Sequence, residues 1–256
     1  MEMKNVVLTR VHAAIQWTQL DNLFSIPSDC PQRDERFGWM GDAAVAAEMA
    51  LHNFDMRDFY LAWLQTVVDT QETEDYYGDC TQPFPGASSD CKGALADTSP
   101  HFPEVYGGRP AEPSWGVALP VITDLLSRHY GAEVTEHLTA AVHAWADFLL
   151  TAKQDGLVTW HRYGDWLQPH RVASTELVSN MTSCFNVLLA LQVASNMGAE
   201  EDRSKFAQEF DTMRSRFFTT YWNQSADSFG DGTQAPQIYA LYLGGAPIEQ
   251  QESALG

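Results

Sequence analysis

The sequence predicts an all-α fold in which successive helices pack in an α/α arrangement. Apolar residues recur at helical spacing through most of the chain, and almost no segment alternates as a strand would. Long loops rich in Pro and Gly join the helical segments. Because no repeat of roughly 20–50 residues is evident, a solenoid is disfavoured.

Roughly seven or eight helical segments are expected from the apolar spacing. They cover about residues 6–23, 43–54, 56–70, 115–130, 134–153, 175–196, 200–222 and 236–243. Pro27 follows the first segment, and Ser174 or Thr175 suits the N-cap of the sixth. The last segment is short and apolar and is soon followed by the final residue, Gly256. We therefore expect residues 1–256 to form one helical domain that is incomplete at its C-terminal end.

Two loops are expected to border a functional site. Residues 75–113 are punctuated by Pro and Gly yet contain five Tyr or Phe side chains, and residues 156–171 contain Trp160, Tyr163 and Trp166. Loops this long in a compact domain are usually functional or disordered. Their aromatic content favours function over disorder.

The charge balance disfavours polyanionic partners. Asp and Glu number 34 against 15 Lys and Arg, which gives a formal net charge of −19. Such a surface is repelled by nucleic acid and by anionic membranes, so neither is an expected partner. No run of about 18 or more consecutive apolar residues is present, so no membrane span is expected.

Neither a metal nor another cofactor is expected. The four cysteines have no Cys-x-x-Cys spacing: Cys30, Cys80, Cys91 and Cys184. Cys80 and Cys91 flank a Pro- and Gly-rich loop and could form a disulfide, although two free thiols are an equally good interpretation. The eight histidines are scattered, and His137 and His143 do not have the spacing that places two side chains on one helical face.

The greatest density of chemical groups lies between Ser28 and Asp42. This stretch holds four carboxylates, two arginines and a tryptophan between Pro and Gly residues. Glycosidic cleavage needs a carboxylic acid beside the leaving oxygen and a second carboxylate that activates water or attacks directly. An aromatic surface for the sugar ring and polar groups for its hydroxyls complete such a site. The stretch offers the residue types for one half of this machinery.

Each of these residues also has a purely structural interpretation. Asp42 precedes an Ala-rich segment and is as well suited to be a helix N-cap as to bind a ligand. Asp29 and Asp34 could form ion pairs with the two arginines of the same loop. Trp39 could belong to the hydrophobic core.

A longer motif resembles the signature of glycoside hydrolase family 78, the α-L-rhamnosidases. It reads Asp29-Cys30-Pro31-Gln32-Arg33-Asp34-Glu35-Arg36, followed by Gly38-Trp39 and Gly41-Asp42. Compatible stretches are Trp115-Gly116, Gly164-Asp165-Trp166-Leu167 and Asp231-Gly232-Thr233-Gln234. The resemblance implies an (α/α)6 barrel of the six-hairpin glycosidase type. It also implies hydrolysis, with inversion, of terminal α-L-rhamnose from small-molecule or oligosaccharide rhamnosides.

The resemblance assigns roles to matching positions. Glu35 would be the general acid and Arg33 would orient the carboxylates. The residues that would bind or line the sugar are Asp29, Trp39, Asp42, Trp115, Asp165 and Trp166, with holding a loop as the alternative for Asp165. Phe37 and Met40 depart from the residues common in the family, but neither would carry the chemistry.

The second catalytic carboxylate is not found. An inverting hydrolase needs a general base roughly 6.5–9.5 Å from the acid. The resemblance implies a Glu in a late Trp-rich loop, and no Trp-Glu-Arg-Trp sequence occurs. We expect the base to lie beyond residue 256 and this chain alone to lack normal activity. Weaker internal candidates lie in or beside loops: Asp97, Glu104, Asp165 and Glu176. For Asp97 and Asp165, contacting the sugar or holding a loop is the better interpretation.

Two other functions remain as alternatives. A carbohydrate-binding protein would keep the pocket without turnover, so its rhamnose binding would survive Glu35→Gln. A different α/α-barrel hydrolase or lyase acting on acidic sugars would need a basic cleft, which the net charge of −19 disfavours.

Overall fold

The computed structural model describes residues 5–71, 91–101, 108, 110–166 and 175–244. Nine α-helices lie within these residues: α1 (Val6–Asp21), α2 (Met40–Asn53), α3 (Arg57–Asp69), α4 (Pro113–Gly116), α5 (Ala118–Tyr130), α6 (Thr139–Thr151), α7 (Glu176–Ala194), α8 (Glu200–Tyr221) and α9 (Gln234–Tyr242). Two 3₁₀ turns, η1 (Ala132–Val134) and η2 (Glu136–Leu138), precede α6. Strands β1 (Trp222–Asn223) and β2 (Ser228–Phe229) form a short antiparallel hairpin, with Trp222 opposite Phe229.

The predicted all-α class is confirmed, with differences at helix boundaries. The helix expected from residue 115 is divided, because Val117 separates α4 from α5. The helix expected from residue 134 begins with η1 and η2 before α6 starts at Thr139. The second helix starts at Met40, earlier than expected.

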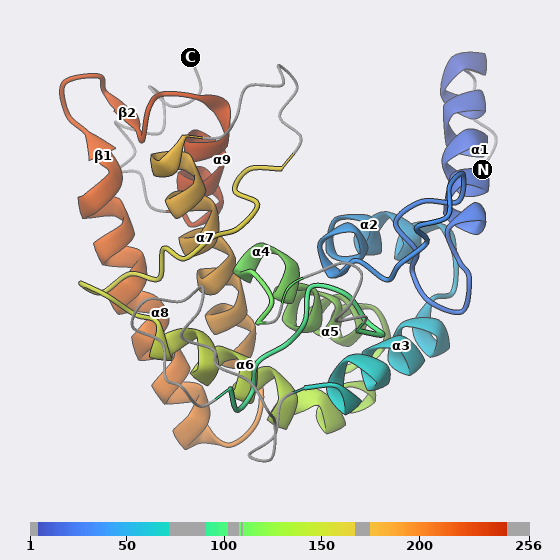
Figure 1. Ribbon diagram of the computed structural model, residues 1–256, viewed down its shortest axis with the longest axis horizontal. Helices are drawn as coiled ribbons and strands as arrows, with labels where there is room; N and C mark the ends of the chain where they lie inside the picture. The colour runs from blue at the N-terminus through green and yellow to red at the C-terminus, as the bar shows by residue number, and fades with distance from the viewer. Residues whose placement is uncertain (1–4, 72–90, 102–107, 109, 167–174, 245–256) are drawn as a thin grey trace.

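The helices form an open arc (Figure 1). Helices α2, α5, α7 and α9 pack in succession, while α3 packs against α5, and α6 and α8 pack against α7. Long loops connect them, as in the α/α arrangement that the sequence predicts. The largest side chains of the core are fully buried between these layers: Trp63, Trp145, Tyr60, Phe148, Phe206 and Phe217.

Helix α1 stands apart from the other helices at one end of the arc (Figure 1). Asn5 caps it by accepting hydrogen bonds from the backbone N–H groups of Val7 and Leu8. Among its residues only Gln19 is buried. Four of its apolar side chains, Val7, Val11, Ile15 and Leu20, are 37–67% exposed.

Helix α7 begins as the sequence predicts. The Thr175 hydroxyl accepts a hydrogen bond from the backbone N–H of Val178 at 3.2 Å, which makes Thr175 the N-cap. By length and composition α7 is apolar enough to cross a membrane, but 67% of its most apolar window is buried. This burial is typical of the central helix of a folded domain.

The cysteines fall into two groups. Cys30 and Cys184 are free and buried, whereas Cys91 is disulfide-bonded. Cys80, which the sequence offers as a partner for Cys91, lies outside the described residues.

Candidate active site

The loop between α1 and α2 is closed upon itself by Asp29. The backbone N–H of Asp29 donates to the carbonyl of Phe37 at 3.0 Å, and the N–H of Phe37 donates back to Asp29 Oδ1 at 2.9 Å. The Asp29 side chain is 7% exposed. Two reciprocal bonds therefore fix the ends of residues 29–37, which we call the acid loop because they contain Glu35.

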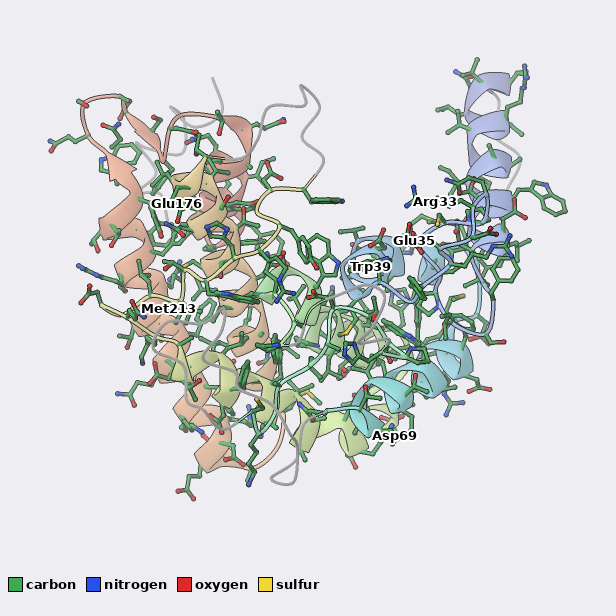
Figure 2. All side chains as sticks on the ribbon, in the orientation of Figure 1. Arg33, Glu35, Trp39, Asp69, Glu176 and Met213 are labelled. Atoms are coloured by element: carbon green, nitrogen blue, oxygen red, sulfur yellow. The ribbon has the colours of Figure 1, made fainter. Side chains whose placement is uncertain are left out.

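Glu35 is held by two neighbours from the same motif. The indole N–H of Trp39 donates to Glu35 Oε1 at 2.8 Å, and the guanidinium of Arg33 forms an ion pair with the Glu35 carboxylate. Arg33 also lies 3.8 Å from Asp29 Oδ2. Figure 2 shows Arg33, Glu35 and Trp39 gathered beside α2. With its side chain 19% exposed, Glu35 is sheltered yet accessible.

A second loop fixes the start of α2. The N–H of Met40 donates to the carbonyl of Asp97, and the N–H of Ser99 donates to the carbonyl of Gly38, both at 2.9 Å. Gly38 has no room for a side chain, because a Cβ there would collide with the Ser99 carbonyl. The backbone on either side of Trp39 is therefore held against residues 97–99.

Asp97 is the centre of a buried polar network. It is 0% exposed. Its Oδ1 accepts from the Glu112 N–H at 2.9 Å, and its Oδ2 accepts from the Gly108 N–H, Arg162 Nη1 and the Tyr163 hydroxyl, each at 2.6 Å. Burial raises the pKa of the Asp97 carboxyl, and these four donors oppose that rise.

Four aromatic rings form a cluster that reaches the acid loop through Trp39. The ring of Tyr163 lies 4.2 Å from Trp115, 5.8 Å from Trp166 and 6.4 Å from Trp39, measured between centroids. Trp115 is 7% exposed, whereas Trp166 is 59% exposed. The structure therefore brings the three predicted tryptophans together, with Tyr163 between them.

Asp42 is not the N-cap of α2, so that structural interpretation is wrong. The helix starts at Met40 after Trp39, and Asp42 lies in its first turn, where the helix dipole favours a carboxylate. Although part of Asp42 is exposed, partial burial raises the pKa of its carboxyl, and the charges of Asp29 and Glu35 raise it further.

A cavity of about 230 Å³ separates α1 from α2 beside the acid loop. Asp29 and Asp42 line it, together with polar groups that include Gln19 and Asn22. Two predicted sugar-binding carboxylates therefore border the same cavity. The two carboxylates can accept hydrogen bonds from the hydroxyl groups of a sugar.

Asp165 lies in the loop before α7 and is half-buried. The pKa of the neighbouring Tyr239 phenol is raised to about 12, chiefly by burial and then by the charges of Asp165 and Glu112. The charge of Asp165 therefore acts on Tyr239 of α9.

The internal candidates for a general base occupy different environments. Asp97 is enclosed and accepts four hydrogen bonds, which fits the role of holding a loop. Glu176 is exposed at the start of α7, 3.3 Å from His161 Nε2, and Figure 2 shows it far across the molecule from Glu35. Glu104 lies outside the described residues.

Ligating atoms of Asp29, Cys30 and Glu35 lie within 4.8 Å of one another. Both carboxylates already accept hydrogen bonds or pair with Arg33. Burial, and then the hydrogen bond to Asp29, raises the pKa of the Cys30 thiol. We assign these three side chains to the closure of the acid loop.

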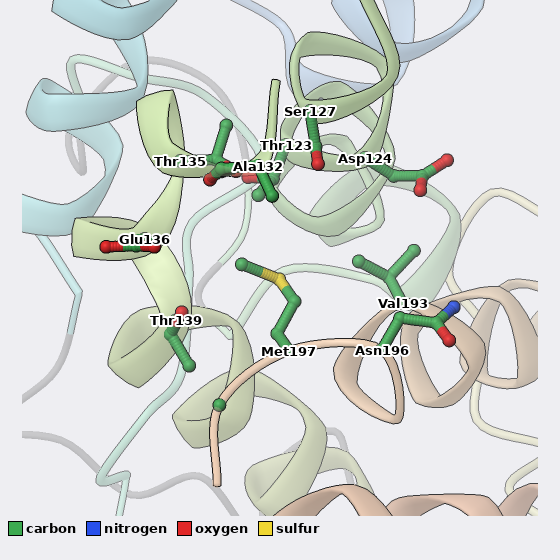
Figure 3. Close-up of a pocket in the computed structure, with 11 residues that line it drawn as sticks. Thr123, Asp124, Ser127, Ala132, Thr135, Glu136, Thr139, Val193, Asn196 and Met197 are labelled. Carbon is green, nitrogen blue, oxygen red and sulfur yellow. Dashed lines mark hydrogen bonds between the residues drawn. The ribbon is translucent and has the colours of Figure 1, made fainter.

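Another cavity has a volume of about 200 Å³ (Figure 3). It is bordered by α5, the 3₁₀ turns and the end of α7, and Met197 projects into it. None of its lining residues belongs to the predicted site.

Sequence reasoning named Tyr163 only as a loop aromatic and missed Arg162 and Glu112. No local pattern identifies them, because their partner Asp97 is 65 residues from Arg162 along the chain. Their role depends on a contact between two loops that only the folded chain creates.

Comparison with known proteins identifies the family. Residues 1–256 match the model of the bacterial alpha-L-rhamnosidase 6 hairpin glycosidase domain. An alpha-L-rhamnosidase of Streptomyces avermitilis is 27% identical over 97% of this chain and 22% of its own length. For an alpha-L-rhamnosidase of Alteromonas sp. the identity is 24%, over 93% of this chain and 25% of that protein.

Solved structures agree. The alpha-L-rhamnosidase from Dictyoglumus thermophilum superposes with a TM-score of 0.81 at 30% identity, over 99% of this chain and 27% of that one. The S. avermitilis enzyme complexed with L-rhamnose gives 0.79 at 26% identity, over 99% and 22%. The chain thus spans about a quarter of the length of these relatives. It belongs to the bacterial α-L-rhamnosidase six-hairpin glycosidase family.

Proposed function

We propose that the polypeptide carrying this chain hydrolyses terminal α-L-rhamnosides with inversion, and that Glu35 is the general acid. The observation that carries the proposal is the placement of Glu35. It is sheltered and oriented by Trp39 and Arg33, beside a cavity lined by Asp29 and Asp42. The relatives bear the name alpha-L-rhamnosidase, and one structure holds L-rhamnose.

In this reaction Glu35 gives its proton to the glycosidic oxygen as the bond to the anomeric carbon breaks. A general base then removes a proton from the water that attacks the opposite face of the sugar. Asp29 and Asp42 accept hydrogen bonds from sugar hydroxyls, and Trp39, Trp115 and Trp166 offer apolar surface to the ring. Arg33 keeps the neighbouring carboxylates in place.

The test is hydrolysis of a methyl α-L-rhamnoside by this chain and by a longer polypeptide that contains it. Glu35→Gln keeps the shape of the side chain but removes its proton, so activity is expected to fall by about 10²–10⁴-fold. Glu48→Gln, on the exposed face of α2, is the matched control and should retain activity. Proton NMR of the first-formed rhamnose would reveal inversion as the β-anomer.

Three other outcomes would change the proposal. Full activity in Glu35→Gln would remove Glu35 as the acid. Rhamnose binding without turnover, even by the longer polypeptide, would favour a carbohydrate-binding protein. Equal turnover by the short chain would place the general base within these 256 residues.

A further inference from the structure

Asp97 is an acidic side chain that is fully buried. Burying a carboxylate is costly unless donors replace its lost water. Asp97 has four such donors, at 2.6–2.9 Å. So complete a set of partners indicates a carboxylate that fixes its surroundings.

The donors come from two separate loops. Gly108 and Glu112 precede α4, whereas Arg162 and Tyr163 lie between α6 and α7. The carbonyl of Asp97 itself accepts from Met40, at the start of α2. Asp97 therefore connects residues 108–112 and residues 162–163 to Met40, which follows the acid loop.

A continuous chain of contacts leads from Asp97 to Glu35. The Tyr163 hydroxyl donates to Asp97 at 2.6 Å, and the pKa of this phenol is raised by burial and by the Asp97 charge, so the hydroxyl keeps its proton. The Tyr163 ring meets Trp39 edge-on at 6.4 Å. The Trp39 indole then donates to Glu35 at 2.8 Å.

We propose that Asp97 is a positioning residue for the general acid: it holds Tyr163, which holds Trp39, which aims Glu35 at the glycosidic oxygen. The inference rests on the proposed function. Proton transfer requires the acid within hydrogen-bond reach of the leaving oxygen. A displacement of about 1 Å in such a group can cost about 10²-fold in rate.

Tyr163→Phe is the first variant, because it removes one hydroxyl and keeps the ring. Asp97→Asn is the second and removes the charge. Tyr130→Phe is the matched control, since the Tyr130 hydroxyl also donates to an aspartate, Asp55, at 2.9 Å, but far along the chain from the acid loop. All three variants are made in whichever polypeptide, this chain or the longer one, hydrolyses rhamnosides. Wild type and Glu35→Gln are measured in parallel.

The measurement is kcat/KM for two rhamnosides that differ in leaving group. A methyl rhamnoside needs protonation of its leaving oxygen, whereas the 2,4-dinitrophenolate of an activated rhamnoside departs without it. We expect Tyr163→Phe to lose about tenfold more kcat/KM on the methyl substrate than on the activated one, with KM changed less than about twofold. Asp97→Asn should show the same bias more strongly, and Tyr130→Phe should show none.

A second measurement reports on the acid loop without any substrate. Cys30 is a free thiol in this loop and Cys184 is a free thiol in the core, so one experiment follows both. Alkylation by iodoacetamide, followed by peptide mass spectrometry, gives each rate. Tyr163→Phe should speed Cys30 labelling several-fold and leave Cys184 unchanged, because the loop opens while the core stays folded.

Equal losses of kcat/KM on both substrates would overturn the inference, since unfolding of a fraction of the enzyme lowers both alike. Faster labelling of Cys184 along with Cys30 would likewise show a global defect. If wild type hydrolyses neither substrate, the proposed function is wrong, and so is this inference, which depends on it. If wild type is active and Tyr163→Phe matches it, only the inference fails.

Discussion

Burial changes the chemistry of Glu112, a residue that the family resemblance does not single out. It is 0% exposed, and its pKa is raised to about 7, mainly by burial and further by the charge of Asp97. The Ser114 hydroxyl donates to Glu112 Oε2 at 2.6 Å and opposes the rise. Within the described residues Oε1 has no hydrogen-bond partner.

This pKa predicts a pH-dependent stability. The folded protein holds the Glu112 proton more tightly than the unfolded chain, whose carboxyl has a pKa near 4.5. The contribution of Glu112 to stability is therefore complete below pH 4.5 and is lost as the pH rises to about 7. Glu112→Gln is permanently neutral, so it should be more stable than wild type at pH 8, by as much as about 3 kcal/mol. Urea unfolding at pH 5 and pH 8 measures the difference.

Glu48→Gln serves as the control, because Glu48 is exposed and should leave the pH dependence unchanged. The prediction is wrong if the free energy of unfolding falls equally for Glu112→Gln and wild type between pH 5 and pH 8. Glu112 would then be neutral at both pH values, or paired at both. The Asp97 carboxyl, whose pKa is also raised, would add a dependence of the same sign that Glu112→Gln leaves in place.

At the residue scale the sequence predicts which side chains lie together better than how they are held. Glu35, Arg33 and Trp39 lie together because they occupy one short motif. Their support from Asp97 and Tyr163 was not predictable, since it depends on contacts between distant loops. A carboxylate in a Pro-rich loop has the same sequence pattern whether it binds a ligand, caps a helix or holds a backbone.

At the scale of elements, the starts of α7 and α2 show that the sequence predicts local features better than contacts between distant loops. Thr175 was identified as a possible N-cap from its residue type, and its hydroxyl does cap α7. By residue type Asp42 suits an N-cap equally well. Helix α2 nevertheless begins at Met40, because backbone hydrogen bonds to residues 97–99 fix the chain there. Where an end is determined by local capping the sequence predicts it, and where a distant loop determines it the sequence does not.

The cap of α7 yields a quantitative prediction. Thr175→Ala removes the acceptor for the Val178 N–H, so the free energy of unfolding should fall by about 1 kcal/mol. Thr175→Ser keeps the hydroxyl and should restore most of the loss. Chemical denaturation followed by far-UV circular dichroism measures both. A serine variant as unstable as the alanine variant would show that the Thr175 methyl group, and not the cap, stabilises this end of the helix.

At the scale of the whole molecule, helix α1 stands at one end of the arc of helices (Figure 1) and carries many exposed apolar side chains. The side chains of α1 that are exposed include Val6, Val7, Leu8, Val11, Ile15, Trp17 and Leu20. Exposed apolar side chains concentrated on one helix mark a contact site or a tendency to aggregate. The net charge of −19 opposes self-association only in part, since salt screens charge but not apolar contact.

We therefore expect the isolated 256-residue chain to self-associate through α1, and more strongly at high salt than at low salt. Val7→Lys with Val11→Lys places two charges one turn apart on this surface and should shift the chain towards monomer in size-exclusion chromatography with light scattering. Gln208→Lys with Thr212→Lys adds the same charges at the same spacing on the exposed side of α8. That control separates the loss of apolar surface from the change in net charge. If wild type is monomeric at all salt concentrations, or if the two double variants have equal effects, the chain does not self-associate through α1.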